Sequence, residues 1–439
     1  RDPSDLGRRM TEVLVVGAGF AGLYAALGLK RIVADGHRVT VVSQESFFQY
    51  QPFLPEVASG TIDPRAAVVP LRPVLRHCRL VIGEAPRIDQ AARRAHVRLA
   101  DGGERAIGYD VLVLAPGSRS RVLPVPGLAE RGIGFKTVQE AIFLRNHVLA
   151  QLEVASVADD EAKRRAALTF VFVGAGFAGV EALGELEDLS RDAISGYPEL
   201  AGTPMRWVLV EATGRILPEL TEELARYAKE RLEDRGIEIA LETRLDSAER
   251  GLISLSSGES FPAETLAWTA GVKPSPLARR SGLPVDEQGR LPVDATLRVQ
   301  GVDELWAGGD AAAVPDVATG KVSPPTAQHG LRQGKRIAAN IELVLAGREP
   351  ERFVYASIGE VCSLGRYKGV ANVKGVRFTG FLGWFLHRSY HLLAMPTWTR
   401  RVKIAMDWSV ALLFPRDVAQ LGSLGRPREP FEQAAGDSA

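Results

Sequence analysis

Two continuous apolar runs, each followed by the same glycine-rich hexapeptide, stand out in the hydrophobic pattern of the chain. Residues 13–16 (VLVV) and 168–173 (LTFVFV) lack the polar alternation of a half-exposed strand, which predicts strands buried on both faces. The hexapeptide GAGFAG follows each run, at 17–22 and at 174–179. The repeat predicts that one supersecondary unit is built twice in this chain.

The segments after the two hexapeptides, from Leu23 and from Val180, have the periodicity of helices. A glycine turn between a buried strand and a helix is the context of a dinucleotide-binding motif. Its first glycine allows the tight turn, the second lets backbone approach a pyrophosphate, and the third lets the helix pack on the strand. The helix N-terminus then attracts the phosphates. The predicted contacts are Gly17, Gly19, Phe20, Ala21, Gly22, Gly174, Gly176, Phe177 and Gly179.

The residue that ends the second strand of each unit indicates which dinucleotide binds. In the second unit the apolar run 207–210 ends in Glu211, and an acid there accepts hydrogen bonds from a ribose and repels a 2′-phosphate, which favours NADH over NADPH. In the first unit the run 39–42 ends in Ser43, so Ser43 or the nearby Glu45 would hold the ribose.

The composition excludes several other classes of protein. With 439 residues, 46% hydrophobic and 24% charged, the chain is long enough for about three structural units with large cores. Lys and Arg total 54 against 53 for Asp and Glu, so no overall charge favours nucleic acid. The seven histidines form no metal-binding pattern, and we expect no metal. Residues 1–9 are polar without an apolar segment behind them, so we expect a cytoplasmic setting.

Three further segments, in their order, resemble landmarks of the two-dinucleotide flavoproteins, in which an FAD domain is interrupted by an NAD(P)H domain. Residues 111–118 resemble the strand and turn that lead to the second domain, and 266–274 resemble the return crossing. Residues 304–310 resemble the second FAD fingerprint, whose aspartate binds the ribityl chain. The site residues that this resemblance implies are Ala115, Gly117, Ala270, Gly271, Gly309 and Asp310.

Within that superfamily the chain is most similar to the type II NADH dehydrogenases, which are single-chain NADH:quinone oxidoreductases. Residues 47–60 resemble the stretch in which Gln51 and Pro52 would lie near the flavin. Glu181 matches a family glutamate near flavin and nicotinamide, and 324–328 matches the start of the quinone-site motif, which includes Ala327 and Gln328. The resemblance covers residues 10–421 and implies FAD and NADH as cofactors and a quinone as acceptor.

Two positions depart from this family, and the candidate catalytic residues keep open alternatives. Ser43 stands where the family has an acid, and Arg332 stands where its quinone motif usually has glutamine. Gln328 would contact the acceptor at the flavin edge or be a simple early-helix residue. His329 would protonate a quinol or face solvent and its neighbours. Glu181 would tune hydride transfer, pass a proton, or be a surface acid favoured by the helix dipole.

The expected fold is α/β, with two Rossmann-like domains and an α-rich C-terminal region. We expect the FAD domain to consist of two segments, 10–120 and 275–350, that are separated by the NADH domain at 121–274. A docking region would follow at 351–439.

The tail contains an apolar stretch, 378–395, that is interrupted by His387, Arg388 and His391, so we do not expect it to span a bilayer. Its tryptophans and basic residues favour a helix pair lying in the membrane interface, with basic side chains on anionic headgroups. The protein would then be peripheral, on the cytoplasmic face of the cell membrane. The alternative is an apolar face that forms a homodimer interface or caps the flavin domain.

The predicted chemistry is hydride transfer from NADH to FAD, followed by delivery of two electrons to a quinone. Cys78 and Cys362 are distant in sequence, and we expect both to be structural thiols, so a dithiol relay is unavailable. One alternative is a soluble tailoring oxidoreductase for a small metabolite, with Arg332 recognising an anionic group. The other is a slow flavin-bearing module for interaction or sensing.

Overall fold

The computed structural model describes residues 10–317 and 320–421, and they form two compact units. The described residues of unit 1 fall in 10–50, 68–121 and 271–357, and those of unit 2 in 51–67, 122–270 and 358–421. The polar stretch 1–9 and the end of the predicted docking region, 422–439, lie outside the described residues.

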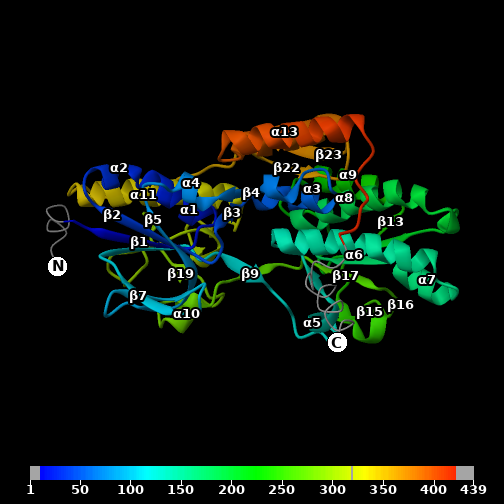
Figure 1. The fold of residues 1–439 in the computed structure, drawn as a ribbon, viewed down its shortest axis with the longest axis horizontal. Helices are drawn as coiled ribbons and strands as arrows, with labels where there is room; N and C mark the ends of the chain where they lie inside the picture. Colours follow the sequence, from blue (N-terminus) through cyan, green and yellow to red (C-terminus); the bar gives the residue numbers. More distant parts are fainter. Residues whose placement is uncertain (1–9, 318–319, 422–439) are drawn as a thin grey trace, which may run out of the picture. The chain divides into compact units, whose positions relative to one another are not determined.

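Unit 1 is built on a seven-stranded sheet of order β20-β8-β1-β2-β5-β6-β7. Its first five strands are parallel, and β5, β6 and β7 form an antiparallel extension. Helices α1, α2 and α11 lie on one face of this sheet (Figure 1). The elements of unit 1 are β1 (Glu12–Val16), α1 (Phe20–Gly28), α2 (Lys30–Ala34), β2 (Arg38–Ser43), β3 (Phe47–Gln49), β4 (Val68–Pro70), α4 (Leu71–Val74), β5 (Arg79–Asp89), β6 (Arg94–Leu99), β7 (Glu104–Gly108), β8 (Val111–Leu114), β9 (Ser118–Ser120), β18 (Val272–Pro274), α10 (Leu277–Arg280), β19 (Leu291–Pro292), β20 (Leu305–Ala307), β21 (Ala312–Ala313) and α11 (Ala327–Leu345).

Unit 2 contains a five-stranded parallel sheet of order β10-β17-β11-β12-β13. One side of its core is closed by the antiparallel sheet β14-β15-β16, whose Ile253 and Phe261 pack with Val171 and Trp268 of the parallel sheet. The elements of unit 2 are α3 (Leu54–Ala58), α5 (Leu128–Arg131), β10 (Ile133–Gly134), α6 (Val138–Ser156), α7 (Glu161–Ala167), β11 (Thr169–Val173), α8 (Phe177–Ala193), β12 (Arg206–Val210), α9 (Glu222–Glu233), β13 (Ile237–Ala240), β14 (Leu245–Ser247), β15 (Leu252–Leu255), β16 (Ser260–Pro262), β17 (Thr265–Trp268), β22 (Gly359–Ser363), β23 (Gly369–Val373), β24 (Val376–Thr379), α12 (Gly380–Ala394) and α13 (Trp398–Leu413).

The structure confirms the α/β fold class and the two predicted strand–turn–helix units. The predicted strands are β1 and β11, and every residue of β11 is buried, as expected for a strand covered on both faces. The helices begin at Phe20 and Phe177, three residues before the points that periodicity indicated. They begin earlier because Gly19 and Gly176 take the N-cap position, so the glycine turn itself starts the helix.

The predicted return crossing, 266–274, contains two strands that belong to different units. Its beginning is β17 in the parallel sheet of unit 2. Its end is β18, which pairs antiparallel with β9 in unit 1. The segment that resembles the second FAD fingerprint contains β20 and leads into a single 3-10 turn, Gly309–Ala311, which includes Asp310.

The tail contains the predicted helix pair, α12 and α13, together with the antiparallel sheet β22-β23-β24. Helix α12 packs on β22 and β23 inside unit 2. The backbone of Gly383 lies against Gly369 of β23, where an added Cβ would stand 2.5 Å from the Gly369 carbonyl oxygen. Sequence reasoning anticipated the helices but not this sheet.

Helix α8 carries an unusual set of buried acids, and arginine side chains neutralise them. Glu187 is 2% exposed and accepts a hydrogen bond of 2.9 Å from Arg235 Nε. The same guanidinium lies 3.0 Å from Asp188 and donates to the Gly184 carbonyl oxygen at 2.8 Å and to the Leu364 carbonyl oxygen. Arg235 therefore joins α8 to the turn between β22 and β23.

Replacing Arg235 with methionine should destabilise unit 2 strongly, because two buried carboxylates would lose their most buried cationic partner while most of the side-chain volume is kept. We expect a loss of about 3–5 kcal/mol in the free energy of unfolding, measured by urea denaturation. Arg231→Met is the control, because its ion pair with Asp234 has exposed fractions of 45% and 60% and should be worth at most about 1 kcal/mol. Equal losses in the two variants would contradict the interpretation.

Candidate functional site

In unit 1 the first glycine turn has the steric features of a dinucleotide-binding loop. Gly17 has a φ of +97°, and a Cβ there would stand 2.2 Å from the carbonyl oxygen of Ala115. A Cβ on Gly22 would lie 1.8 Å from the Gly17 carbonyl oxygen, so only glycine lets the helix meet the strand. Around Gly19 an added Cβ would find no atom within 4 Å. The backbone at Gly19 is therefore open to a phosphate.

In unit 2 the second turn repeats this geometry. Gly174 has a φ of +107°, and its Cβ would meet the amide nitrogen of Ala270 at 2.7 Å. A Cβ on Gly179 would stand 1.9 Å from the Gly174 carbonyl oxygen, while Gly176 has open space around it. Helix α8 starts at Phe177, directly after this opening. Each unit therefore offers one helix N-terminus to a pyrophosphate.

Glu211 lies at the end of β12 and holds the second turn in place. One of its carboxylate oxygens accepts the backbone N–H of Ala175 at 2.8 Å, and the other accepts the N–H and the hydroxyl of Thr213, both at 2.9 Å. A carboxylate has about four lone-pair positions, so capacity remains for a ribose hydroxyl. Arg215, the nearby cation, donates to the carbonyl oxygens of Pro218 and Leu220 instead.

The corresponding position in unit 1 is less polar. Ser43 is the last residue of β2 and is buried, whereas Glu45 is exposed two residues later. Phe20 begins α1 and packs edge-on against Phe48, with 5.0 Å between ring centres, and Ala21 is buried beside it. Sequence reasoning gave no indication of this aromatic contact beneath the turn.

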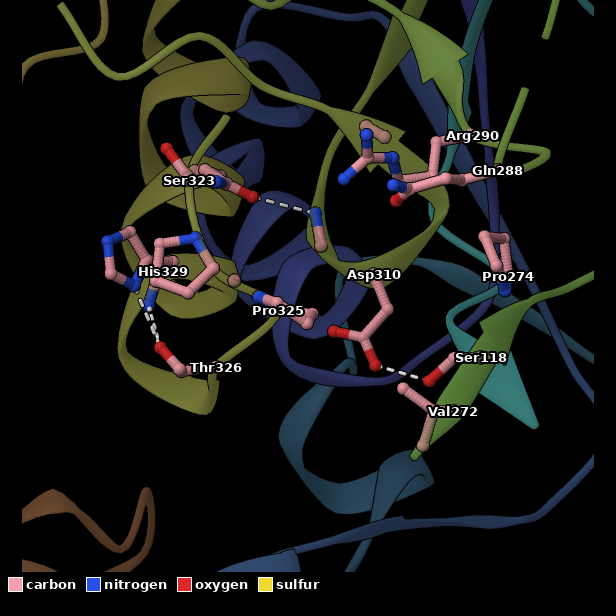
Figure 2. Close-up of a pocket in the computed structure, with 15 residues that line it drawn as sticks. Ser118, Val272, Pro274, Gln288, Arg290, Asp310, Ser323, Pro325, Thr326 and His329 are labelled. Atoms are coloured by element: carbon pink, nitrogen blue, oxygen red, sulfur yellow. Dashed lines mark hydrogen bonds between the residues drawn. The ribbon is translucent and has the colours of Figure 1, made fainter. Parts of the chain in front are cut away.

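A cavity of about 130 Å³ opens in unit 1 between Asp310 and the start of α11. Figure 2 shows Asp310 hydrogen-bonded to the hydroxyl of Ser118, which lies at the start of β9, directly after the positive-φ residue Gly117. Opposite them, Thr326 caps α11 and its hydroxyl lies 2.8 Å from His329 Nδ1. The lining residues are Ser118, Val272, Pro274, Gln288, Arg290, Gly309, Asp310, Ala312, Ser323, Pro324, Pro325, Thr326, His329, Gly330 and Gln333.

The acceptor-site candidates on α11 differ in their relation to the cavity. His329 lines the cavity, whereas Gln328 and Arg332 do not, and all three lie beside Tyr355. Burial is the main cause that lowers the pKa of His329 below its usual value. Asp316 opposes this effect and Arg332 adds to it, and the net shift is downward, so His329 is neutral at pH 7. Ala327 is the first residue of the helix.

Tyr355 was missed by sequence reasoning. It lies outside regular structure in the segment between α11 and β22, where no motif or periodicity marks it. Its hydroxyl donates to Gln328 Oε1 at 2.6 Å, and the guanidinium of Arg332 lies 4.2 Å from its ring centre. Only the folded chain shows that this tyrosine belongs with the acceptor-site candidates.

The predicted residues Gln51, Pro52 and Glu181 all belong to unit 2. Gln51 donates to the carbonyl oxygen of Lys136 at 3.2 Å, and Pro52 lies in the same short 3-10 turn. Their placement near a flavin remains a prediction. Ala270 ends the unit 2 segment 122–270 and Gly271 begins the next segment of unit 1.

Glu181 is 6% exposed, so it is not a surface acid. Its Oε1 accepts the backbone N–H of Ser363 at 3.0 Å and lies 3.0 Å from His387 Nε2, although that approach lacks hydrogen-bond alignment.

Burial, reinforced by Glu181, raises the pKa of the Cys362 thiol well above its usual value. Burial also raises the pKa of Cys78 to about 12. Both thiols are therefore protonated and poor nucleophiles.

The two tail helices present an apolar surface to solvent. Within the described residues, neither α12 nor α13 nor any other helix combines the length and apolar character needed to cross a bilayer. Arg388, which the sequence suggested for lipid headgroups, is instead 6% exposed and stacks on Trp384 and Trp408 at 4.3 and 4.9 Å. That expectation was wrong because Glu56, buried beneath these helices, attracts the guanidinium. The exposed apolar side chains of the pair are Phe381, Leu382, Phe385, Leu393, Trp398, Val402, Met406, Val410, Leu412 and Leu413.

Comparisons with known proteins agree with this geometry. A family model described as pyridine nucleotide-disulphide oxidoreductase matches residues 11–334. The type II NADH:quinone oxidoreductase Ndh of Mycobacterium tuberculosis is 30% identical over 431 residues, which cover 95% of this chain and 91% of that protein. The type II NADH:quinone oxidoreductase of Staphylococcus aureus (strain NCTC 8325) is 31% identical over 375 residues, covering 84% and 91%.

Solved structures show the same fold at lower identity. NDH2 from Plasmodium falciparum in complex with NADH has a TM-score of 0.87 at 16% identity, covering 94% of this chain and all of that one. The sulfide:quinone oxidoreductase of Aquifex aeolicus has a TM-score of 0.69 at 16% identity, covering 93% and 96%. Since the family model matches most of the chain and the M. tuberculosis relative is similar over nearly its whole length, the chain belongs to the type II NADH:quinone oxidoreductases of the pyridine nucleotide-disulphide oxidoreductase family.

Proposed function

We propose that this chain oxidises NADH through FAD and passes two electrons to a membrane quinone. The main support for the proposal is the pair of open glycine turns, one in each unit. Helix α11 adds the polar side chain of Gln328, and the two cysteines, Cys78 and Cys362, are free rather than paired as a redox disulfide. FAD supplies the redox chemistry, because it accepts a hydride from NADH and releases electrons to a second substrate. Family membership supports the same activity.

Unit 1 would hold the FAD and unit 2 the NADH. The turn at 17–22 would bind the FAD pyrophosphate, and Asp310, fixed by Ser118, would hold the ribityl chain. The turn at 174–179 would bind the NADH pyrophosphate, with Glu211 on the adenosine ribose. NADH is preferred over NADPH because Glu211 repels a 2′-phosphate and Arg215 is occupied by backbone carbonyl groups.

At the acceptor end, Gln328 would contact the quinone and Arg332 would supply positive charge. His329 is not the proton donor in this proposal, since its burial keeps it neutral at physiological pH. Glu181 would act as a buried group that holds a proton beside the reacting rings. Its burial and the approach of His387 Nε2 to 3.0 Å from its carboxylate support that role.

The apolar surface of α12 and α13 would dock on the cytoplasmic side of the cell membrane, where NADH is available. Along α13 (orange-red in Figure 1), Trp398, Val402, Met406 and Val410 recur at every fourth residue and form one exposed stripe. Such a stripe suits a helix that lies in the plane of the interface. A lipid surface would bring the enzyme to quinones, which dissolve in the bilayer.

Glu211→Gln should reduce the preference for NADH, because glutamine keeps an acceptor for the Ala175 N–H but loses the charge that binds ribose and repels phosphate. Charged hydrogen bonds contribute about 1.5–3 kcal/mol, so the ratio of kcat/KM for NADH over NADPH should fall by at least about tenfold. The measurement is steady-state kinetics with ferricyanide as acceptor. Glu238→Gln, whose carboxylate binds Arg206 at the surface, is the control. An unchanged ratio would contradict the assignment of Glu211.

Replacing Trp398 and Leu413 together with glutamate should weaken membrane binding without unfolding the protein, since their exposed fractions are 73% and 79%. Each large apolar side chain gains about 1.5–3 kcal/mol on leaving water, so vesicle binding should fall by more than about tenfold. Co-sedimentation with phosphatidylglycerol/phosphatidylethanolamine vesicles measures this. Val157→Glu, just after α6 and 78% exposed, is the control. If the wild type does not co-sediment with vesicles but dimerises through this surface, the docking proposal fails.

The function itself is tested by anaerobic stopped-flow with the FAD-loaded protein. One equivalent of NADH should bleach the flavin absorbance, and mixing with a short-chain quinone should restore it within milliseconds to seconds. Fast bleaching without reoxidation by quinone would favour a soluble oxidoreductase that acts on a small metabolite. A reduced flavin that persists with every acceptor would favour the sensing role instead.

A further inference from the structure

Tyr355 contacts all three acceptor-site candidates on α11, although none of them is its neighbour in sequence. Its hydroxyl donates to Gln328 Oε1 at 2.6 Å across 27 residues. The guanidinium of Arg332 lies 4.2 Å from the ring centre, and the ring of His329 meets it edge-on at 4.9 Å. One aromatic side chain is therefore the common support of this polar group.

In the structure the hydrogen bond to Oε1 leaves the other end of the Gln328 amide available. A glutamine amide has one acceptor end and one donor end, and rotation about its last bond exchanges them. Because the tyrosine hydroxyl occupies the oxygen, the NH₂ group is left to donate. A quinone carbonyl oxygen gains negative charge when the quinone is reduced, so a donor stabilises the product side of electron transfer.

The ring of Tyr355 also fixes Arg332. The guanidinium stacks on the ring, and its Nη1 donates to the Gln328 carbonyl oxygen at 3.0 Å. Stacking on an aromatic face and a hydrogen bond together hold a side chain that has many rotamers in water. The cation and the amide are thereby held side by side, and both present donors.

We propose that Tyr355 is a positioning residue that fixes Gln328 as a hydrogen-bond donor to the carbonyl oxygen of the quinone. The inference rests on the proposed NADH:quinone function. It adds that Gln328 donates the hydrogen bond to the quinone and that Tyr355 orients its amide for this. A purely structural role for the hydroxyl is disfavoured by its surroundings. Tyr355 is only partly buried, its neighbours Val354 and Ala356 are exposed, and the segment is anchored instead by the buried Phe353.

The test compares full-length, FAD-loaded wild type with Tyr355→Phe, which keeps the ring beneath Arg332 and removes only the hydroxyl. Bleaching of the flavin by NADH should be unchanged. Reoxidation by a short-chain quinone should slow by about tenfold at saturating quinone, because the lost interaction strengthens as charge develops. Reoxidation by ferricyanide, which accepts electrons without a hydrogen-bond donor, should not change.

A matched control exists in the same unit. Tyr109 also donates its hydroxyl to a glutamine side chain, Gln90 Oε1 at 2.8 Å, but lies outside the candidate site. Tyr109→Phe should therefore leave both half-reactions as in the wild type. A second check is a double-mutant cycle, in which Tyr355→Phe should add almost nothing to the slowing caused by Gln328→Ala.

Three results would overturn the inference while leaving the proposed function intact. They are quinone reoxidation of Tyr355→Phe at the wild-type rate, equal slowing with quinone and ferricyanide, and additive effects with Gln328→Ala. Failure of quinone to reoxidise the wild-type flavin would overturn the proposed function and the inference with it. Reoxidation of the wild-type flavin by quinone therefore shows whether the proposed function or only the role of Tyr355 has failed.

Discussion

Close backbone contact at the two glycine turns is the constraint on which the rest of the structure depends. Helices α1 and α8 can pack against their strands only because Gly22 and Gly179 have no Cβ, and the chain can turn there only because Gly17 and Gly174 accept positive φ. The same contact leaves the helix N-termini open at the carboxyl ends of parallel strands, where dinucleotides bind in such sheets. The close packing of helix on strand therefore also determines where a dinucleotide can bind.

A second requirement follows from helix α8, which carries its buried acids within unit 2. Glu181, Glu185 and Glu187 are all under 7% exposed, and unpaired charges at that depth would cost several kcal/mol each. Residues of the tail are part of the answer, since Arg416 lies 3.6 Å from Glu185 and His387 lies 3.0 Å from Glu181. The tail, which presents an apolar surface to solvent, therefore also places polar side chains against the buried acids of the dinucleotide-binding unit.

The features that sequence reasoning predicted are those written in short stretches of chain. Buried strands, glycine turns and the acid at Glu211 follow from local rules, and the structure contains β1, β11 and β12 as expected. What was missed depends on contacts across long sequence separations. Tyr355 is 27 residues from Gln328 in sequence, and Glu56 is 352 residues from Trp408, whose indole N–H it accepts. No local pattern could reveal either pairing, nor the burial of Arg388 beside Glu56 and Trp408.

The candidate residues of α11 supply positive charge to an acceptor but no proton. Arg332 carries a permanent positive charge, and Tyr355 holds it beside the Gln328 amide. Burial lowers the pKa of His329 and keeps it neutral at pH 7, although Asp316 opposes that shift, and its Nδ1 lies against the Thr326 hydroxyl. A positive, donor-rich site stabilises an acceptor as it gains electrons, yet none of Gln328, His329 and Arg332 holds a proton that it could release at that pH. The protons of a quinol must therefore reach the acceptor from outside this group, by water or by another buried acid.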